Sequence, residues 1–131
     1  MKVGAPARLD DLAARAVYAA ACAGLLVFSL VFVLLATIEG LTVPWYDPIG
    51  HAWHMASSKP APTAMDWFGR VAISLTSAAV AALITFIATR RRPVSSSLLR
   101  AASIWALATT VLGLFLYAWT LGNRVILPPG S

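Results

Sequence analysis

Three long apolar stretches dominate the chain, and none of them contains a charged residue or a proline. They are AVYAAACAGLLVFSLVFVLLATI (16–38), VAISLTSAAVAALITFIAT (71–89) and AASIWALATTVLGLFLYAWTL (101–121). About 20 apolar residues in a helix cross the roughly 30 Å hydrocarbon core of a bilayer. A lone strand would leave its backbone polar groups unpaired in lipid. The pattern therefore predicts an all-α integral membrane protein with three transmembrane helices.

The segments between these stretches predict one membrane domain over residues 1–131. A long outer loop over 39–70 joins the first two helices, and a short inner loop over 90–100 joins the second and third. Composition supports this class, because 60% of the residues are hydrophobic and only 11% are charged. Soluble domains carry about 25% charged residues, so a soluble fold is excluded.

Local spacing predicts two ion pairs and the caps of three helices. Asp10 or Asp11 is expected to cap the first helix and Asp66 the second. Asp11 with Arg15, and Asp66 with Arg70, stand four residues apart, where side chains on a helix meet. The three serines at 95–97 precede the third apolar stretch, and serine hydroxyls are good acceptors at a helix N-terminus. We expect one of these serines to cap the third helix.

The distribution of basic residues predicts the orientation. Seven lie before the first helix or between the second and third: Lys2, Arg8, Arg15, Arg90, Arg91, Arg92 and Arg100. The other three lie elsewhere: Lys59, Arg70 and Arg124. Basic residues favour the cytoplasmic side, so the N-terminus is expected inside. The net charge of +5 thus reflects topology, and no nucleic-acid partner is expected. Arg90, Arg91 and Arg92 are predicted to contact lipid headgroups, and bound lipid is expected.

Tryptophans stand near the predicted ends of the helices and in the outer loop, where amphipathic rings suit the headgroup layer. The predicted interfacial anchors are Trp45, Trp53, Trp67 and Trp119. The alanine- and arginine-rich composition is typical of a bacterium with a GC-rich genome, so the expected location is the bacterial inner (cytoplasmic) membrane.

The outer loop contains DPIGHAWHM over 47–55, which predicts a short interfacial helix over 48–57. Asp47 before Pro48 is a favourable helix start. Apolar residues follow at i, i+3, i+4 and i+7, which is the spacing of one helical face: Ile49, Ala52, Trp53 and Ala56. On such a helix the two histidines of the chain would be neighbours on another face.

His51 and His54 are the candidate metal ligands. Imidazole nitrogens bind copper or zinc, and Asp47 or Asp66 could add a carboxylate; axial ligation of haem is a further possibility. A lone H-x-x-H pair without a committed third ligand is weak evidence, so the favoured interpretation is two polar side chains that face water or a partner. No cofactor is therefore expected, and copper or haem remains the alternative.

Small residues four apart line one face of each predicted helix and would allow close helix approach. They are Ala20 and Gly24 in the first helix, Ser74, Ala78 and Ala82 in the second, and Ala106 and Thr110 in the third. Three thin helices enclose little volume, so some of these faces are expected to pack against other membrane-protein subunits.

No Asp, Glu, Lys, Arg or His lies within the three apolar stretches, and such groups mark ion and proton pathways. No nucleotide, hydrolase or metalloprotease motif is present. We therefore expect a non-enzyme, namely a small accessory subunit of a larger bacterial membrane complex, such as a respiratory, photosynthetic or oxidase-like one in electron transport. The alternatives are a periplasm-facing copper- or haem-handling protein that uses His51 and His54, and a homo-oligomeric pore former or small transporter component.

Overall fold

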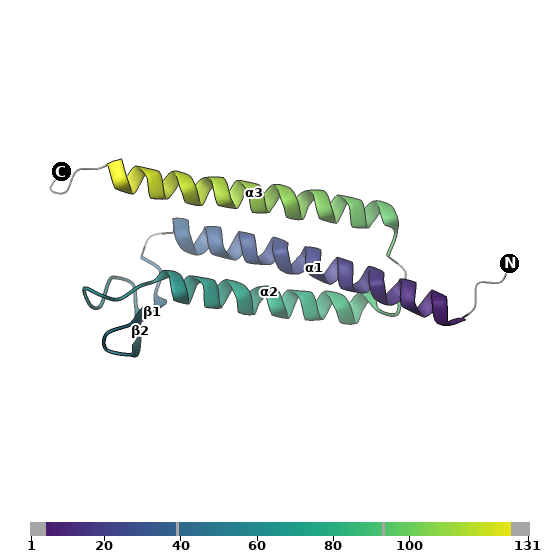
Figure 1. Cartoon of the computed structure of the whole chain (residues 1–131), viewed down its shortest axis with the longest axis horizontal. Helices are drawn as coiled ribbons and strands as arrows, with labels where there is room; N and C mark the ends of the chain where they lie inside the picture. Colours follow the sequence, from purple (N-terminus) through teal and green to yellow (C-terminus); the bar gives the residue numbers. More distant parts are fainter. Residues whose placement is uncertain (1–4, 39, 93, 127–131) are drawn as a thin grey trace.

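A computed structural model shows three long helices that run alongside one another, with a β-hairpin at one end (Figure 1). It describes residues 5–38, 40–92 and 94–126. The elements are α1 Ala5–Thr37, β1 Val43–Asp47, β2 Ala52–Ala56, α2 Trp67–Thr89 and α3 Ser96–Ile126. In the described residues, α1 packs against both α2 and α3, whereas α2 and α3 do not pack against each other. Helix α1 is therefore the centre of the molecule.

Each helix contains a stretch that is long and apolar enough to cross a membrane: Asp11–Thr37, Trp67–Thr89 and Ser96–Thr120. The mostly helical architecture agrees with the predicted multi-pass, all-α membrane protein. Helices α1 and α3 are longer than the apolar stretches, since α1 starts at Ala5 and α3 continues to Ile126. Asp10 and Asp11 thus lie within α1, and the prediction that one of them caps it is wrong. At 1.5 Å per residue, the 33 residues of α1 extend about 50 Å, so part of it must lie outside the roughly 30 Å core.

The two ends of the bundle differ in chemistry. The hairpin lies beside the start of α2 and forms the hairpin end, together with the last turns of α1 and α3 (Figure 1). The opposite end holds the start of α1 and the connection from α2 to α3. We call it the basic end, because it carries the described arginines Arg15, Arg90, Arg91, Arg92 and Arg100.

The prediction of an interfacial helix over 48–57 is wrong. Residues 52–56 form β2, which pairs antiparallel with β1 in the register Val43↔Ala56 to Asp47↔Ala52. A helix of about ten residues is marginal by itself, whereas the hairpin satisfies the backbone by pairing with a segment outside the predicted helix. Asp47 still orders the residues that directly follow it. Its carboxylate accepts a hydrogen bond from the Ile49 N–H at 3.1 Å, which makes a turn instead of a helix start.

Small residues join α1 to α2. Ala16 and Ser74 are fully buried, and Ala78 is 8% exposed. A Cβ placed on Gly24 would lie 3.4 Å from both the Ala78 carbonyl oxygen and the Ala82 Cβ, which is ordinary van der Waals contact. The small face of α2 is thus covered by α1 of the same chain.

Hydroxyl groups join α1 to α3. Ser29 and Thr110 form a hydrogen bond of 3.1 Å between their hydroxyl oxygens, and Tyr18 forms another with Ser103. The sequence predicted Thr110 as a helix-packing residue but did not identify Ser29 or Ser103. Inter-helix hydrogen bonds in membranes contribute about 0.6 kcal/mol each on average, so this contact combines modest polar bonds with the packing of Ala106, which is buried.

Substitution of Ala78 tests the contact between α1 and α2. Leucine at 78 would overpack the close approach to α1, and overpacking costs about 1–3 kcal/mol. We expect Ala78→Leu to lower the free energy of unfolding by that amount, measured by titration with denaturing detergent in micelles. The matched control is Ala79→Leu, because Ala79 is exposed and leucine there should be tolerated. Equal effects of the two variants would contradict the packing described here.

Candidate functional site

The hairpin is held rigidly against the start of α2. Tyr46 exchanges two backbone hydrogen bonds with Met65, of 2.9 and 2.8 Å, so a third extended segment pairs with β1 on the edge away from β2. Gly69 lies against the carbonyl of Pro44, and a Cβ at position 69 would collide with that oxygen. Glycine is therefore required where the helix and the hairpin meet, and the hairpin keeps one position relative to α2.

Aromatic rings strengthen this junction. The ring of Tyr46 lies 5.0 Å from that of Trp53 on β2 and 5.8 Å from that of Phe68 on α2. Trp67 stacks on Phe68 with ring centroids 3.8 Å apart. Trp45 instead donates its indole N–H to the Ala56 carbonyl at 3.0 Å, which adds a side-chain bond across the two strands.

Three of the four predicted interfacial anchors are exposed, namely Trp53, Trp67 and Trp119, whereas Trp45 is half-buried. Their contact with lipid headgroups remains a prediction. The hairpin also exposes two aliphatic side chains, since Ile49 in the turn is 74% exposed and Met55 on β2 is 67% exposed. Together with Trp53, these residues are exposed apolar side chains of the turn and β2, and we call this set of three the hairpin tip.

The two histidines do not share a helical face. His51 lies in the turn with a backbone φ of +48°, and His54 lies on β2 opposite Trp45. Both are exposed. In the described part of the chain, no three histidine, cysteine, aspartate or glutamate side chains gather closely enough to hold a metal ion. His54 does lie near Asp47, whose pKa it helps to lower.

Asp47 organises the turn and the segment that follows. The Thr63 hydroxyl donates to its carboxylate at 2.6 Å, and this bond is the main reason why the pKa of Asp47 lies below its ordinary value. Backbone N–H groups of Gly50 and Ile49 act in the same direction. Because each bond favours the charged form, the ionised carboxylate holds the turn and residue 63 together.

A polar hollow lies behind the hairpin, between the three helices. It has a volume of about 200 Å³ and is lined by Asp66 directly before α2, Arg70 of α2, Phe32 of α1, and Tyr117 of α3 among others. The predicted ion pair between Asp66 and Arg70 is present, and their side chains are only 24% and 18% exposed. Asp66 does not cap α2 with its side chain. The Arg70 Nε is buried without a hydrogen-bond partner among the described residues.

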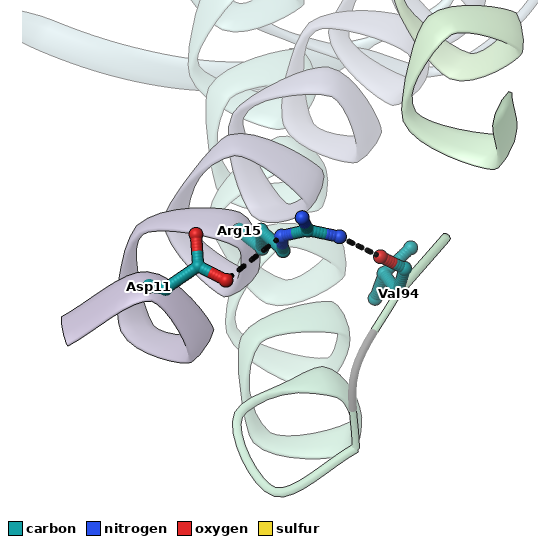
Figure 2. Close-up of polar contacts among 3 residues, drawn as sticks. All are labelled: Asp11, Arg15 and Val94. Carbon is teal, nitrogen blue, oxygen red and sulfur yellow. Dashed lines mark hydrogen bonds and ion pairs between the residues drawn. The ribbon is translucent and has the colours of Figure 1, made fainter. Parts of the chain in front are cut away.

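The basic end is tied together by Arg15 (Figure 2). Its Nε lies 3.3 Å from the Asp11 carboxylate, which confirms the predicted ion pair. Its Nη1 donates to the Val94 carbonyl at 2.9 Å, so α1 holds the segment that leads into α3. The predicted serine cap is also present, because the Ser95 hydroxyl accepts from the Leu98 N–H at 3.3 Å.

Arg90, Arg91 and Arg92 follow the end of α2 and are exposed. Their predicted contact with lipid headgroups is compatible with this position and remains a prediction. The described residues of the two ends thus offer surfaces for recognition: an apolar and aromatic one at the hairpin tip, and a cationic one at the opposite end.

Comparison with known proteins shows no matching family model, no similar curated protein and no similar solved structure. The function must therefore be argued from these surfaces.

Glycine substitutions test the turn. A non-glycine residue in the left-handed region costs about 1–2 kcal/mol, so His51→Gly should stabilise the hairpin by about 1 kcal/mol. His54→Gly should destabilise it by about 0.5–1 kcal/mol, because glycine weakens a strand. Amide hydrogen exchange of β1 and β2 in micelles measures both changes. Shifts of the same sign for the two variants would show that the turn conformation is wrong.

The bonds to Asp47 predict a pH dependence. A carboxyl group with a lowered pKa in the folded state stabilises the fold above its ordinary pKa of 3.8, and this contribution is lost as the pH falls through the folded value. Thr63→Val removes the strongest of the bonds, so the pKa of Asp47 should rise toward 3.8. Carbon-detected NMR titration of the carboxyl group measures the change. Ser58→Ala, at an exposed position, should leave the pKa unchanged.

Proposed function

We propose that this protein is a small, non-catalytic accessory subunit of a larger complex in the bacterial inner membrane. The hairpin tip would dock on an extramembrane part of a larger subunit. The observation that carries the proposal is the apolar hairpin tip, which is held in one position by the junction of Pro44 and Gly69 and by the backbone pairing of Tyr46 with Met65. A preordered apolar surface loses little conformational freedom on binding.

The exposed residue types of the hairpin tip fit a protein contact. Interfaces are enriched in tryptophan and methionine, and large aromatic side chains supply much of the binding energy. Trp53 is supported from behind by Tyr46, while 57% of its surface stays accessible. The tip also lies on β2, whose outer edge has no strand partner among the described residues, so a partner could add a strand there.

The interior of the bundle supports a scaffold role. Most hydroxyl groups of α2 bond to backbone carbonyls one turn earlier, as Ser74 does to Arg70 at 2.7 Å and Thr85 does to Ala81 at 2.8 Å. The hydroxyls on the α1–α3 contact bond to one another. These groups are occupied within the chain and do not line a polar path, so the observation favours a subunit over a pore former or transporter component.

The orientation belongs to the same proposal. The basic end is placed in the cytoplasm, because arginines and lysines favour that side, and the hairpin end faces the outside. A partner that docks on the hairpin tip would then have an external domain. We propose that the complex serves electron transport, as a respiratory, photosynthetic or oxidase-like assembly, with its redox chemistry in the partner subunits.

Copper or haem handling by His51 and His54 remains a weaker candidate. The hairpin places the two residues on a turn and a strand, and no third ligand of the described residues joins them. A site there would need donors from another chain.

Purification in mild detergent from the native source tests the proposal. We expect wild-type chain to elute with at least one other polypeptide at fixed stoichiometry. The double variant Ile49→Ser with Met55→Ser removes two apolar side chains of the hairpin tip and leaves the rings of Tyr46, Trp53 and Phe68 in place. Recovery of the partner polypeptide should fall about tenfold or more. The matched control is Leu41→Ser with Met65→Ser, which changes two exposed aliphatic residues at the same end but outside the tip.

Each alternative has its own outcome. A chain that elutes alone would overturn the accessory-subunit proposal, and a homo-oligomer would favour the pore former. Stoichiometric copper or haem that disappears in His51→Ala with His54→Ala would favour the metal-handling protein. Equal loss of partner in both serine variants would show that the hairpin tip is not the docking surface.

A further inference from the structure

An apolar cleft with two arginines at its rim lies between α1 and α3 at the basic end. Its volume is about 360 Å³, and it is lined by Ala14, Arg15 and Tyr18 of α1 and by Ser96, Leu99 and Arg100 of α3. The floor is therefore apolar, while the cationic groups come from two different helices. Arg90, Arg91 and Arg92 do not line this cleft.

The two arginines are placed to bind an anion. Arg15 is held by Asp11 and by the Val94 carbonyl (Figure 2), which limits the conformational freedom that it would lose on binding. Arg100 is exposed and forms no ion pair with any side chain that the structure describes. The start of α3 at Ser96 adds the positive end of a helix dipole beside them.

The contact between α1 and α3 also has an apolar hollow farther from the basic end. A second hollow, of about 140 Å³, is lined by Leu25 and Phe28 of α1 and by Leu114 of α3 among others. Tyr18 and Leu25 are seven residues apart, and Arg100 and Leu114 are fourteen apart, so each pair lies on nearly the same face of its helix. The two hollows therefore open on one side of the bundle.

We call the strip of the α1–α3 contact from the cleft to the second hollow the furrow. Its length matches the depth of one leaflet of a bilayer. Arg15 and Leu25 are ten residues apart, which corresponds to about 15 Å along a helix. Half of a hydrocarbon core of roughly 30 Å has the same depth. A molecule with its anionic group at the rim would place its hydrocarbon chain against Leu25, Phe28 and Leu114.

We propose that this cleft and furrow bind one anionic phospholipid, with its phosphate between Arg15 and Arg100 and one acyl chain along the contact of α1 with α3. Charge complementarity selects an anionic over a zwitterionic headgroup, because Arg15 and Arg100 line the cleft and no acidic residue does. The nearby carboxylate of Asp11 pairs with Arg15, which leaves the charge of Arg100 without a partner among the described side chains. The apolar furrow selects a lipid over a free phosphate. The site is independent of the protein partner proposed for the hairpin tip.

Native mass spectrometry of the full chain in micelles tests this site. Phosphatidylglycerol and phosphatidylcholine with identical acyl chains are titrated separately, and glycerol 3-phosphate is added as a competitor without acyl chains. We expect wild-type chain to bind one phosphatidylglycerol more tightly than phosphatidylcholine. Arg100→Gln should weaken phosphatidylglycerol binding about fivefold and leave phosphatidylcholine binding unchanged. Lys59→Gln removes the same charge at an exposed position at the hairpin end, outside the cleft, and should have little effect.

A second pair of variants tests the shape of the cleft. Ala14→Leu fills it and should weaken the binding of both lipids, whereas Ala13→Leu, at an exposed neighbouring position that does not line it, should not. Equal effects of Arg100→Gln and Lys59→Gln would show diffuse attraction and overturn the proposal. Equal affinity for the two lipids, or full displacement by glycerol 3-phosphate, would overturn it as well. Circular dichroism and elution volume confirm that each variant remains folded.

Discussion

Close approach of α1 and α2 through small side chains is the contact on which the other elements depend. In lipid, helices gain little from the hydrophobic effect, and their association relies on packing and on hydrogen bonds between them. Ala16, Ser74 and Ala78 are buried at this contact, and Gly24 lets α1 approach the backbone of α2 at Ala78. The hairpin is attached at the start of α2, and α3 packs on α1 but on no other described element, so the α1–α2 contact fixes how the hairpin and α3 lie relative to each other.

The contact of α1 with α3 has a different character, and the difference has consequences for binding. Paired hydroxyl groups hold it at two levels, Tyr18 with Ser103 and Ser29 with Thr110. Larger side chains beside these pairs leave hollows open to one side. A tight contact excludes other molecules, whereas a looser one can admit an acyl chain. The proposed lipid site therefore follows from how α3 is attached.

The two ends of the molecule are suited to different partners. At the hairpin end, β1 is paired on both edges, with β2 and with Met65, and this support holds an exposed apolar tip outside the helices. At the basic end, arginines lie beside the start of α3, and their charge suits the phosphates of lipid headgroups. A subunit that binds lipid at one end and a protein at the other would be held at a defined depth and angle in the membrane.

The sequence by itself determined the three membrane-spanning helices, the ion pairs of Asp11 with Arg15 and Asp66 with Arg70, and the serine cap of α3. Each of these depends on a run of neighbours or on residues within four positions along a helix. Only the tertiary structure decided the conformation of residues 48–57, because the strand there forms by pairing with Val43–Asp47. The tertiary structure also decided which helix faces of small residues are covered within the chain. Pairing and burial depend on segments distant in sequence, and helical spacing in one short segment does not report them.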